Sequence, residues 1–288
     1  MKYGIIDVGS NSVRLLLDGN KQVINTQLAE NMCAGGDLIA PAMERTAEAI
    51  FALRDIAEKE GAKVAVFATE AVRSARNSAV FIDKLRLGGI DLDILGPKDE
   101  AYVGFAGAYY GDGIKGVLDV GGASSELAVG DNNGIIYSYS LPIGGVRIKD
   151  YSSDPIKQAA HCEETVKKYG SVPRFDELIS IGGTSSSIVA VLKKLDPYDP
   201  SKVHMAVLSY DMIKEAVDYI DSVPVAERTK IIGLHPKKTI VVPAGGKIIL
   251  SAMKYLGFDK ITVSESDNLE GYAKLKGIPL KAGNILTI

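Results

Sequence analysis

Two stretches of the sequence place an aspartate directly before a turn rich in glycine and serine. Residues 4–19 read GIIDVGSNSVRLLLDG, and residues 116–131 read GVLDVGGASSELAVGD. The backbone N–H groups of such a turn can surround an anion, because glycine permits close approach and positive φ angles. An aspartate at the end of the preceding strand can hold Mg²⁺ beside a bound phosphate. A third glycine turn is Gly182-Gly183-Thr184. Three such turns favour phosphate binding over the alternative of simple tight hairpins.

The two aspartate-containing stretches are also copies of one another. At an offset of 112 residues, six of their sixteen positions are identical, and Arg14 in the first copy matches Glu126 in the second. A period this long is not that of a solenoid repeat. We therefore expect two similar domains, residues 1–115 and 116–288. The sequence has neither a G-x-G-x-x-G nor a G-x-x-x-x-G-K-[ST] motif, which argues against Rossmann and P-loop folds.

Hydrophobic periodicity and turn residues predict alternating strands and helices, which is typical of an α/β fold. The predicted strands are 3–8, 13–18, 21–28, 62–68, 91–95, 134–141, 177–181 and 261–263, with Gly19-Asn20 as the hairpin turn after the second. The predicted helices run from Pro41 to Gly61, from a cap at Asn77 or Ser78 to 86, and over 99–110, 155–169, 184–194, 210–221, 224–231, 244–257 and 268–275.

Composition and charge exclude several classes of protein. The net charge of −3 argues against non-specific binding to nucleic acids or membrane surfaces. The sequence shows no signal peptide and no apolar run of membrane-spanning length, so we expect a soluble cytoplasmic protein. Cys33 and Cys162 have no neighbours at metal-ligand spacing and fit reduced thiols in the cytosol.

Several further stretches resemble one known family. They are IIDVGSNSVRLLL (5–17), FATEAVRSARN (67–77), DEAYVGFAGA (99–108), LDVGGASSEL (118–127), SLPIGGVRI (140–148), ISIGGTSSSI (179–188), ERTKIIGLHP (227–236) and ITVSESDNLEG (261–271). In this order they are similar to the exopolyphosphatase/guanosine pentaphosphate phosphohydrolase (Ppx/GppA) family, within the superfamily of actin, sugar kinases and heat-shock chaperones. The resemblance implies an α/β protein with two similar domains of the actin-like ATPase (ribonuclease H-like) fold and an interdomain cleft.

The resemblance also implies roles for individual residues. Glu100 matches the catalytic base, although without the resemblance an exposed glutamate at a helix start would be the better interpretation. Asp119 and Glu126 match a site for Mg²⁺ or another divalent cation. The turns and two arginines would bind phosphate. These phosphate-binding residues are Asp7, Gly9, Ser10, Asn11, Ser12, Arg14, Arg73, Gly121, Gly122, Ala123, Ser124, Ser125, Gly182, Gly183 and Thr184.

The sequence departs from the family pattern at four residues. Ala123 and Ser125 stand where the family has glycine and threonine, and Leu269 stands where it has arginine. Asp99 is a conservative exchange in the acidic segment. Other polar residues have a plainer interpretation. His161, His204 and His235 have no serine or cysteine partner for nucleophilic catalysis. Arg228, Lys230, Lys237 and Lys238 could line an entry for an acidic substrate, but a solvated face is favoured.

These observations predict an exopolyphosphatase that uses a divalent cation and water to release orthophosphate from the end of polyphosphate. The alternatives are a guanosine pentaphosphate 5'-phosphohydrolase and a nucleotide-binding or kinase-type protein of the same fold. The expected partners are polyphosphate or guanosine pentaphosphate as substrate and a second copy in a homodimer, with no nucleic acid and no membrane. Substrate length, preferred metal and oligomeric state stay open at this point.

Overall fold

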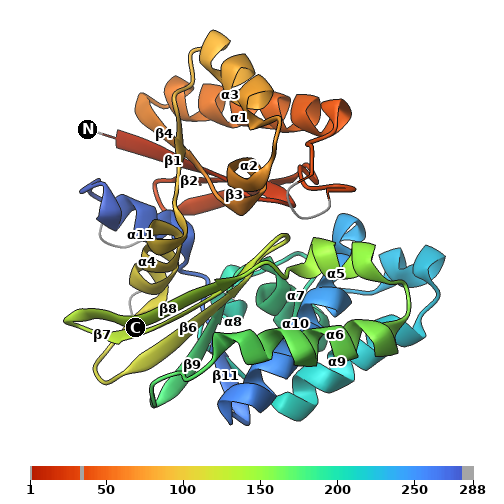
Figure 1. The fold of residues 1–288 in the computed structure, drawn as a ribbon. Helices are drawn as coiled ribbons and strands as arrows, with labels where there is room; N and C mark the ends of the chain where they lie inside the picture. The colour runs from red at the N-terminus through yellow and green to blue at the C-terminus, as the bar shows by residue number, and fades with distance from the viewer. Residues whose placement is uncertain (1, 33–35, 281–288) are drawn as a thin grey trace. The chain divides into compact units, whose positions relative to one another are not determined.

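We describe the protein from a computed structural model that covers residues 2–32 and 36–280. The chain folds into two compact units (Figure 1). Unit 1 combines Met1–Gly107 with Asn268–Ile288, and unit 2 is Ala108–Asp267. Over the covered ranges, no helix has both the length and the apolar character needed to cross a membrane.

Unit 1 is built around a mixed sheet. Its strands are β1 (Lys2–Val8), β2 (Ser12–Leu17), β3 (Asn20–Asn25), β4 (Ala62–Ala68) and β5 (Leu92–Ile94), in the order β3-β2-β1-β4-β5. Its helices are α1 (Ala40–Lys59), α2 (Glu70–Ser74), α3 (Ser78–Leu87), α4 (Pro97–Ala108) and α11 (Asn268–Leu275). Strands β1, β4 and β5 are parallel, so their carboxyl ends lie together, which we call the carboxyl edge of the sheet.

Local sequence explains how these elements begin and turn. Pro41 lies in the first turn of α1, where its missing N–H costs nothing. The hairpin between β2 and β3 turns at Asp18 and Gly19, with φ angles of 48° and 75°, and Leu17 pairs with Asn20. Two successive positive φ angles fit a two-residue hairpin turn. The predicted turn at Gly19-Asn20 was therefore wrong by one residue.

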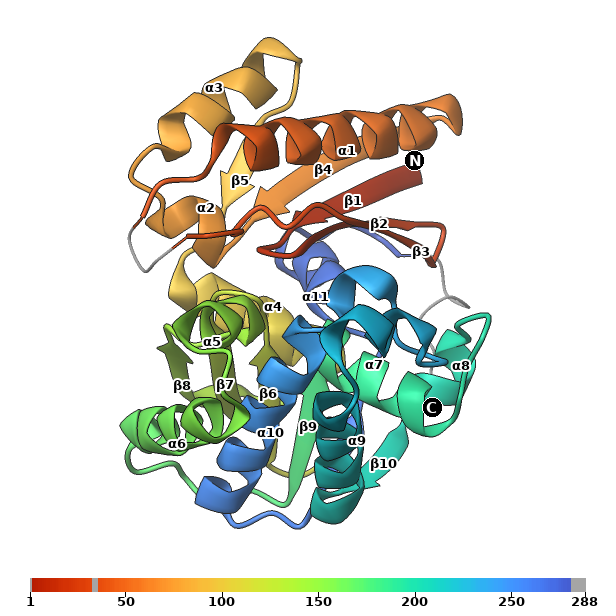
Figure 2. The same cartoon turned by 90° about the vertical axis from the view of Figure 1, so that its right-hand side faces the viewer.

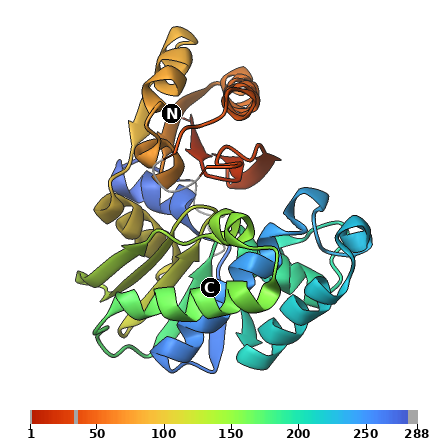
Figure 3. The same ribbon diagram turned by 45° about the vertical axis from the view of Figure 1, so that its right-hand side comes forward.

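The last helix of the described chain belongs to unit 1. Leu269 and Tyr272 of α11 lie in a hydrophobic cluster with Ile5, and the Tyr272 ring stacks on Phe67 with 4.3 Å between ring centroids. Figures 1 and 3 show α11 beside α4. A Cβ atom at Gly271 would lie only 1.7 Å from the carbonyl oxygen of Val103, so this approach requires glycine.

This packing differs from the expected division of the chain at 115/116. That boundary follows the sequence repeat and assigns the whole C-terminal segment to the second domain, whereas the structure groups the segment from Asn268 onward with unit 1. The physical reason is that the apolar face of α11 is buried against unit 1 strands. Leu269 takes part in this burial, which explains why an apolar residue suits that position.

Unit 2 is built around a second mixed sheet, in the order β10-β11-β9-β6-β7-β8. Its strands are β6 (Lys115–Val120), β7 (Ser125–Asp131), β8 (Gly134–Leu141), β9 (Glu177–Ile181), β10 (Ala206–Ser209) and β11 (Lys260–Val263). Its helices are α5 (Gly145–Tyr151), α6 (Pro155–Val166), α7 (Gly183–Leu192), α8 (Pro200–Val203), α9 (Tyr210–Ser222) and α10 (Val241–Leu256). Helix α10 packs against α5, α6, α7 and α9, and Figure 2 shows it between α6 and α9.

The two sheets share their topology. β6 pairs antiparallel with β7 and parallel with β9, as β1 does with β2 and β4. Asp119 pairs with Glu126 where, 112 residues earlier, Asp7 pairs with Arg14. The predicted duplication and the α/β fold of two similar units are thus confirmed. The short elements α2, α5, α8 and β10 were not predicted.

Candidate functional site

The turn between β1 and β2 directs the N–H groups of Asn11 and Ser12 away from the neighbouring segment, residues 26–29. Gly9 N–H donates to the Ser12 carbonyl at 3.0 Å and closes the turn. The carbonyls of Ser10 and Asn11 accept hydrogen bonds of 2.9–3.1 Å from N–H groups in residues 26–29. Because C=O and N–H point in opposite directions across a trans peptide, the N–H groups of Asn11 and Ser12 point away from that segment. This is the geometry of an anion-binding turn.

The turn between β6 and β7 is built in the same way. Gly121 N–H donates to the Ser124 carbonyl, again at 3.0 Å. The carbonyls of Gly121 and Gly122 accept hydrogen bonds of 2.9 Å from Gly145 and Val146 at the start of α5. The N–H groups that follow these carbonyls therefore point away from α5. Both copies thus share one turn geometry, and phosphate binding at these turns stays a prediction.

The charged pair behind each turn differs between the copies. In unit 1, Arg14 Nε donates to Asp7 Oδ2 at 3.0 Å, and Asp7 is buried. In unit 2, the corresponding pair is Asp119 and Glu126, both acidic and directly opposite one another. The Glu126 side chain is buried, with 4% of the residue exposed, and its Oε1 accepts a hydrogen bond of 2.7 Å from Ser140 Oγ. The first pair joins opposite charges, whereas the second places two acidic residues opposite one another.

Two of the predicted phosphate-binding side chains of unit 2 are turned inward. The Ser125 hydroxyl is fully buried and donates to the Ile143 carbonyl at 2.6 Å, so the prediction that it contacts phosphate is not supported. Thr184 Oγ1 is buried and lies 3.4 Å from the Val120 carbonyl. It thereby ties the third glycine turn to the end of β6.

Tyr169, which the sequence did not single out, lies beneath the second turn with its hydroxyl 3.3 Å from the Ser125 carbonyl. Complete burial and the charge of Glu126 raise the pKa of Tyr169 well above its usual range, so this hydroxyl stays protonated.

Glu100 is buried and ion-paired at the carboxyl edge of unit 1. Only 5% of Glu100 is exposed, which excludes the interpretation of an exposed helix-start residue. Arg73 Nη1 donates to Glu100 Oε2 at 2.8 Å and to the Leu95 carbonyl at 2.5 Å, while Nη2 donates to Glu70 Oε2 at 2.6 Å. Burial alone would lower the pKa of Arg73, but the charges of Glu100 and Glu70 raise it above its ordinary value. Arg73 therefore holds two carboxylates.

The third glycine turn connects β9 to α7 beside Asp119. Gly182 has φ +90°, and a Cβ atom there would lie 2.7 Å from Asp119 Oδ1. A Cβ atom at Gly183 would lie 2.8 Å from the ammonium nitrogen of Lys238. Lys238 comes from the 3-10 helix Pro236–Lys238, far along the chain. The solvated-face interpretation was therefore wrong for Lys238, although Lys237 and Lys230 are exposed.

The remaining candidates have structural surroundings. His161 stacks on Tyr151, and His204 Nδ1 accepts a hydrogen bond of 3.1 Å from the Glu265 backbone N–H. Burial raises the pKa of the Cys162 thiol to about 12, so it is not a nucleophile at neutral pH. Cys33 lies outside the described residues. Within the described ranges, no group of three or more histidine, cysteine, aspartate or glutamate side chains is placed to hold a metal ion.

Comparison with known proteins gives a consistent picture. The sequence matches the model of the Ppx/GppA phosphatase family over residues 13–273. The bifunctional 3-dehydroquinate synthase/phosphatase of Fusobacterium nucleatum is 31% identical, over 96% of this chain and 46% of that protein. A guanosine-5'-triphosphate,3'-diphosphate pyrophosphatase of Vibrio atlanticus is 26% identical, over 94% of this chain and 58% of that protein. The chain thus spans about half the length of these curated relatives.

A solved structure supports the same similarity over the full fold. The crystal structure of the Aquifex aeolicus member of the Ppx/GppA protein family superposes with a TM-score of 0.76 at 27% identity. The match covers 96% of this chain and 98% of that one.

Proposed function

Because the chain belongs to the Ppx/GppA phosphatase family, we propose that it is an exopolyphosphatase, which releases the terminal phosphate of inorganic polyphosphate by attack of water. The observation that carries this proposal is the buried Glu100 carboxylate held by Arg73. A carboxylate fixed at the carboxyl edge of the unit 1 sheet, which also carries the β1–β2 turn, is suited to accept a proton from an attacking water. Unit 2 alone carries two glycine turns, at the carboxyl ends of the parallel strands β6 and β9, with Lys238 beside the second, which favours a substrate with several phosphates.

In the proposed reaction, Glu100 accepts a proton while the water oxygen forms a bond to the terminal phosphorus. The bond between that phosphorus and the bridging oxygen breaks, and its electron pair leaves with the shortened chain. Arg73 holds the Glu100 carboxylate in place through their ion pair. The outward N–H groups of the turns balance the negative charge of the phosphates, which is the main task of a protein in phosphoryl transfer.

The donor set of unit 2 fits a divalent cation. Mg²⁺ takes one or two carboxylates and keeps several water ligands. Asp119 and Glu126 supply two carboxylates from neighbouring strands, and the missing Cβ of Gly182 lets Asp119 Oδ1 lie against the third glycine turn. These two residues would hold the cation, which when bound would neutralise phosphate charge.

A second candidate is hydrolysis of guanosine pentaphosphate, favoured by the name of the Vibrio atlanticus relative. Release of orthophosphate from long polyphosphate, short polyphosphate, guanosine pentaphosphate and ATP separates the candidates, measured with Mg²⁺ and with EDTA. We expect the fastest release from polyphosphate, and loss of release with EDTA or in the Glu100→Gln variant. Preference for guanosine pentaphosphate would select the second candidate. Failure on all four substrates would favour a nucleotide-binding protein, and transfer from ATP to an acceptor would favour a kinase.

A further inference from the structure

Residues 223–239 form a strap that leads from the end of α9 to the start of α10. It contains the 3-10 helices Val225–Lys230 and Pro236–Lys238. The second of these brings the Lys238 ammonium group to the third glycine turn, beside Gly183. The backbone hydrogen bonds within the strap join residues only three positions apart, such as Glu227 N–H to the Pro224 carbonyl at 2.8 Å, so its course across the protein depends on contacts with its surroundings.

The guanidinium group of Arg228 joins the two ends of the strap. Nε donates to the Val223 carbonyl at 2.9 Å, and Nη1 donates to the Thr239 carbonyl at 3.2 Å. Nη2 donates to the Asp221 carbonyl at 3.2 Å. Arg228 is 7% exposed, so these bonds are shielded from water. Because Thr239 follows Lys238 directly, the bond to its carbonyl also limits where Lys238 can lie.

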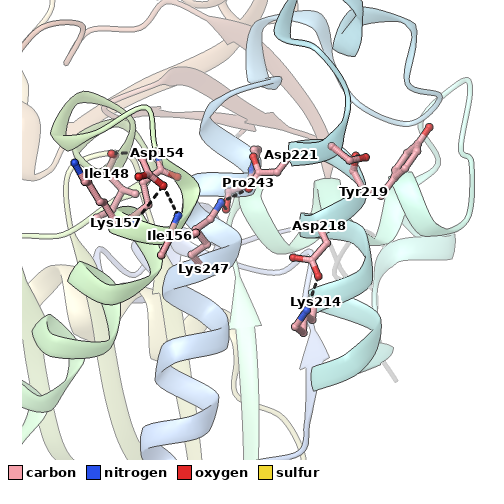
Figure 4. A network of polar contacts seen from close by, with 12 residues as sticks. Ile148, Asp154, Ile156, Lys157, Lys214, Asp218, Tyr219, Asp221, Pro243 and Lys247 are labelled. Carbon is pink, nitrogen blue, oxygen red and sulfur yellow. Dashed lines mark hydrogen bonds and ion pairs between the residues drawn. The ribbon is translucent and has the colours of Figure 1, made fainter.

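A single carboxylate balances two buried cations at this point. Asp221 Oδ1 lies 3.4 Å from Arg228 Nη2, and Asp221 Oδ2 accepts a hydrogen bond from Lys247 of α10. Figure 4 shows Lys247 reaching Asp221 and Pro243, whose carbonyl is 3.3 Å from Lys247 Nζ. Lys247 is only 6% exposed. A buried charge that loses its partner is strongly unfavourable, so this carboxylate fixes both cations.

The middle of the strap is fixed independently by backbone packing. Gly233 has φ +85°, and a Cβ atom there would lie 2.2 Å from the Ala190 carbonyl of α7. The strap is therefore attached at both ends and at its centre, and the helix it packs on is the one that begins at Gly183.

We propose that Asp221 is a positioning residue for substrate binding: by fixing Arg228 and Lys247, it holds the strap so that Lys238 lies beside the third glycine turn and contacts a substrate phosphate. The role rests on the proposed function, because it assigns Lys238 to the same phosphate chain. Asp221 itself does not touch substrate in this scheme and acts through the position of Lys238.

The first test measures binding of tripolyphosphate by calorimetry in the Glu100→Gln background, where turnover is blocked. We expect Asp221→Asn to weaken binding by about tenfold, because it leaves two buried cations without a carboxylate. Asp221→Asn/Lys247→Met removes one of these cations and should restore part of the affinity. Asp218→Asn is the matched control, since this aspartate lies on the same helix in an exposed pair with Lys214 (Figure 4).

A double-mutant cycle with Lys238→Met separates positioning from a general loss of stability. If Asp221 acts through Lys238, Asp221→Asn will weaken binding much less in the Lys238→Met background than in its presence. Hydrogen exchange of peptides from 223–239 should accelerate in Asp221→Asn and not in Asp218→Asn. The proposal would be overturned if the effects of Asp221→Asn and Lys238→Met on binding were additive, or if neither substitution changed the affinity for tripolyphosphate.

The proposed function can fail separately from this inference. In otherwise unmodified protein, we expect Asp221→Asn to raise KM for polyphosphate with kcat within about twofold of the original value. Tripolyphosphate binding with the expected cycle, but no phosphate release by the unmodified protein, would reject the hydrolase and retain the positioning role. Normal hydrolysis by the unmodified protein, with the same KM in Asp221→Asn, would retain the hydrolase and reject the positioning role.

Discussion

Asp119 lies directly opposite Glu126 across the ladder between β6 and β7. The same position in the other copy of the fold holds Asp7 and Arg14, which neutralise one another. One duplicated backbone thus carries a neutral pair in unit 1 and two acidic side chains in unit 2. Acidic residues at directly opposite positions of neighbouring strands favour a cation nearby.

This relationship predicts how the activity depends on metal. Asp119→Asn and Glu126→Gln should each raise the Mg²⁺ concentration needed for half-maximal phosphate release by about 10–100-fold. EDTA should abolish release, and added Mg²⁺ should restore it. Asp131→Asn, at the far end of β7, is the control and should titrate like the unmodified protein. Equal Mg²⁺ dependence in all variants would remove these two residues from the metal site.

Glu100→Gln tests the assigned base. The variant should fold normally and lose about 10²–10⁴-fold in kcat, because the amide cannot accept the proton of water. Its neighbour Asp99 is exposed in the same first turn of α4, so Asp99→Asn should keep near-normal activity. Steady-state phosphate release by the two variants measures this difference, and circular dichroism checks that each variant is folded. Unchanged turnover in Glu100→Gln would refute the role.

Gly182→Ala should disturb Asp119. Its methyl group would collide with Asp119 Oδ1, and the positive φ angle adds about 1–2 kcal/mol of backbone strain. Gly170→Ala provides the matched control, because Gly170 has a similar glycine-specific conformation, with φ 64° and ψ −146° against φ 90° and ψ 171° at Gly182, but its Cβ would meet no atom within 4 Å. Both variants should unfold at lower temperature in calorimetry. Only Gly182→Ala should also need a higher Mg²⁺ concentration for activity; the same need in Gly170→Ala would point to strain alone.

Glu177 should contribute to stability in a pH-dependent way. Burial alone would raise its pKa, but hydrogen bonds from Lys115, Thr262 and Tyr110 lower the pKa below its ordinary value. A lowered folded-state pKa gives stability that is present above the unfolded-state pKa and is lost as the pH falls through the folded-state pKa.

Glu177→Gln should therefore lower the free energy of unfolding by about 1 kcal/mol at neutral pH. The difference from the unmodified protein should shrink below about pH 4. Urea unfolding at several pH values across this range measures the difference in unfolding free energy. The control is Glu44→Gln, because Glu44 forms an exposed ion pair with Lys84. A difference that does not vary with pH would contradict the linkage.

The sequence was most informative where structure is local. Strands such as β1 and β9 follow from short apolar runs, and the repeated Asp-Val-Gly turns correctly indicated two copies of one fold. Elements of only a few residues, such as β10, were missed because they have no periodic pattern. The turn after β2 was placed one residue late because both Gly19 and Asn20 suit a turn.

The environment of the site could not be read from sequence in the same way. Glu100 and Arg73 meet because β4 and β5 are parallel neighbours, which brings together the segments that follow them. Lys238 reaches Gly183 only through the strap and its buried anchor, Arg228. Burial of Ser125 likewise depends on the Ile143 carbonyl, a partner contributed by the segment after β8.

The return of α11 to unit 1 affects the order in which the protein can fold during synthesis. Unit 2 is one continuous stretch of chain, whereas the first 107 residues lack the cover that Leu269 and Tyr272 provide over Ile5 and Phe67. Domains tend to fold as they leave the ribosome, from the N-terminal end. We expect the opposite order here: most of unit 1 is synthesised first, but its core is complete only after unit 2 and then α11 have been synthesised.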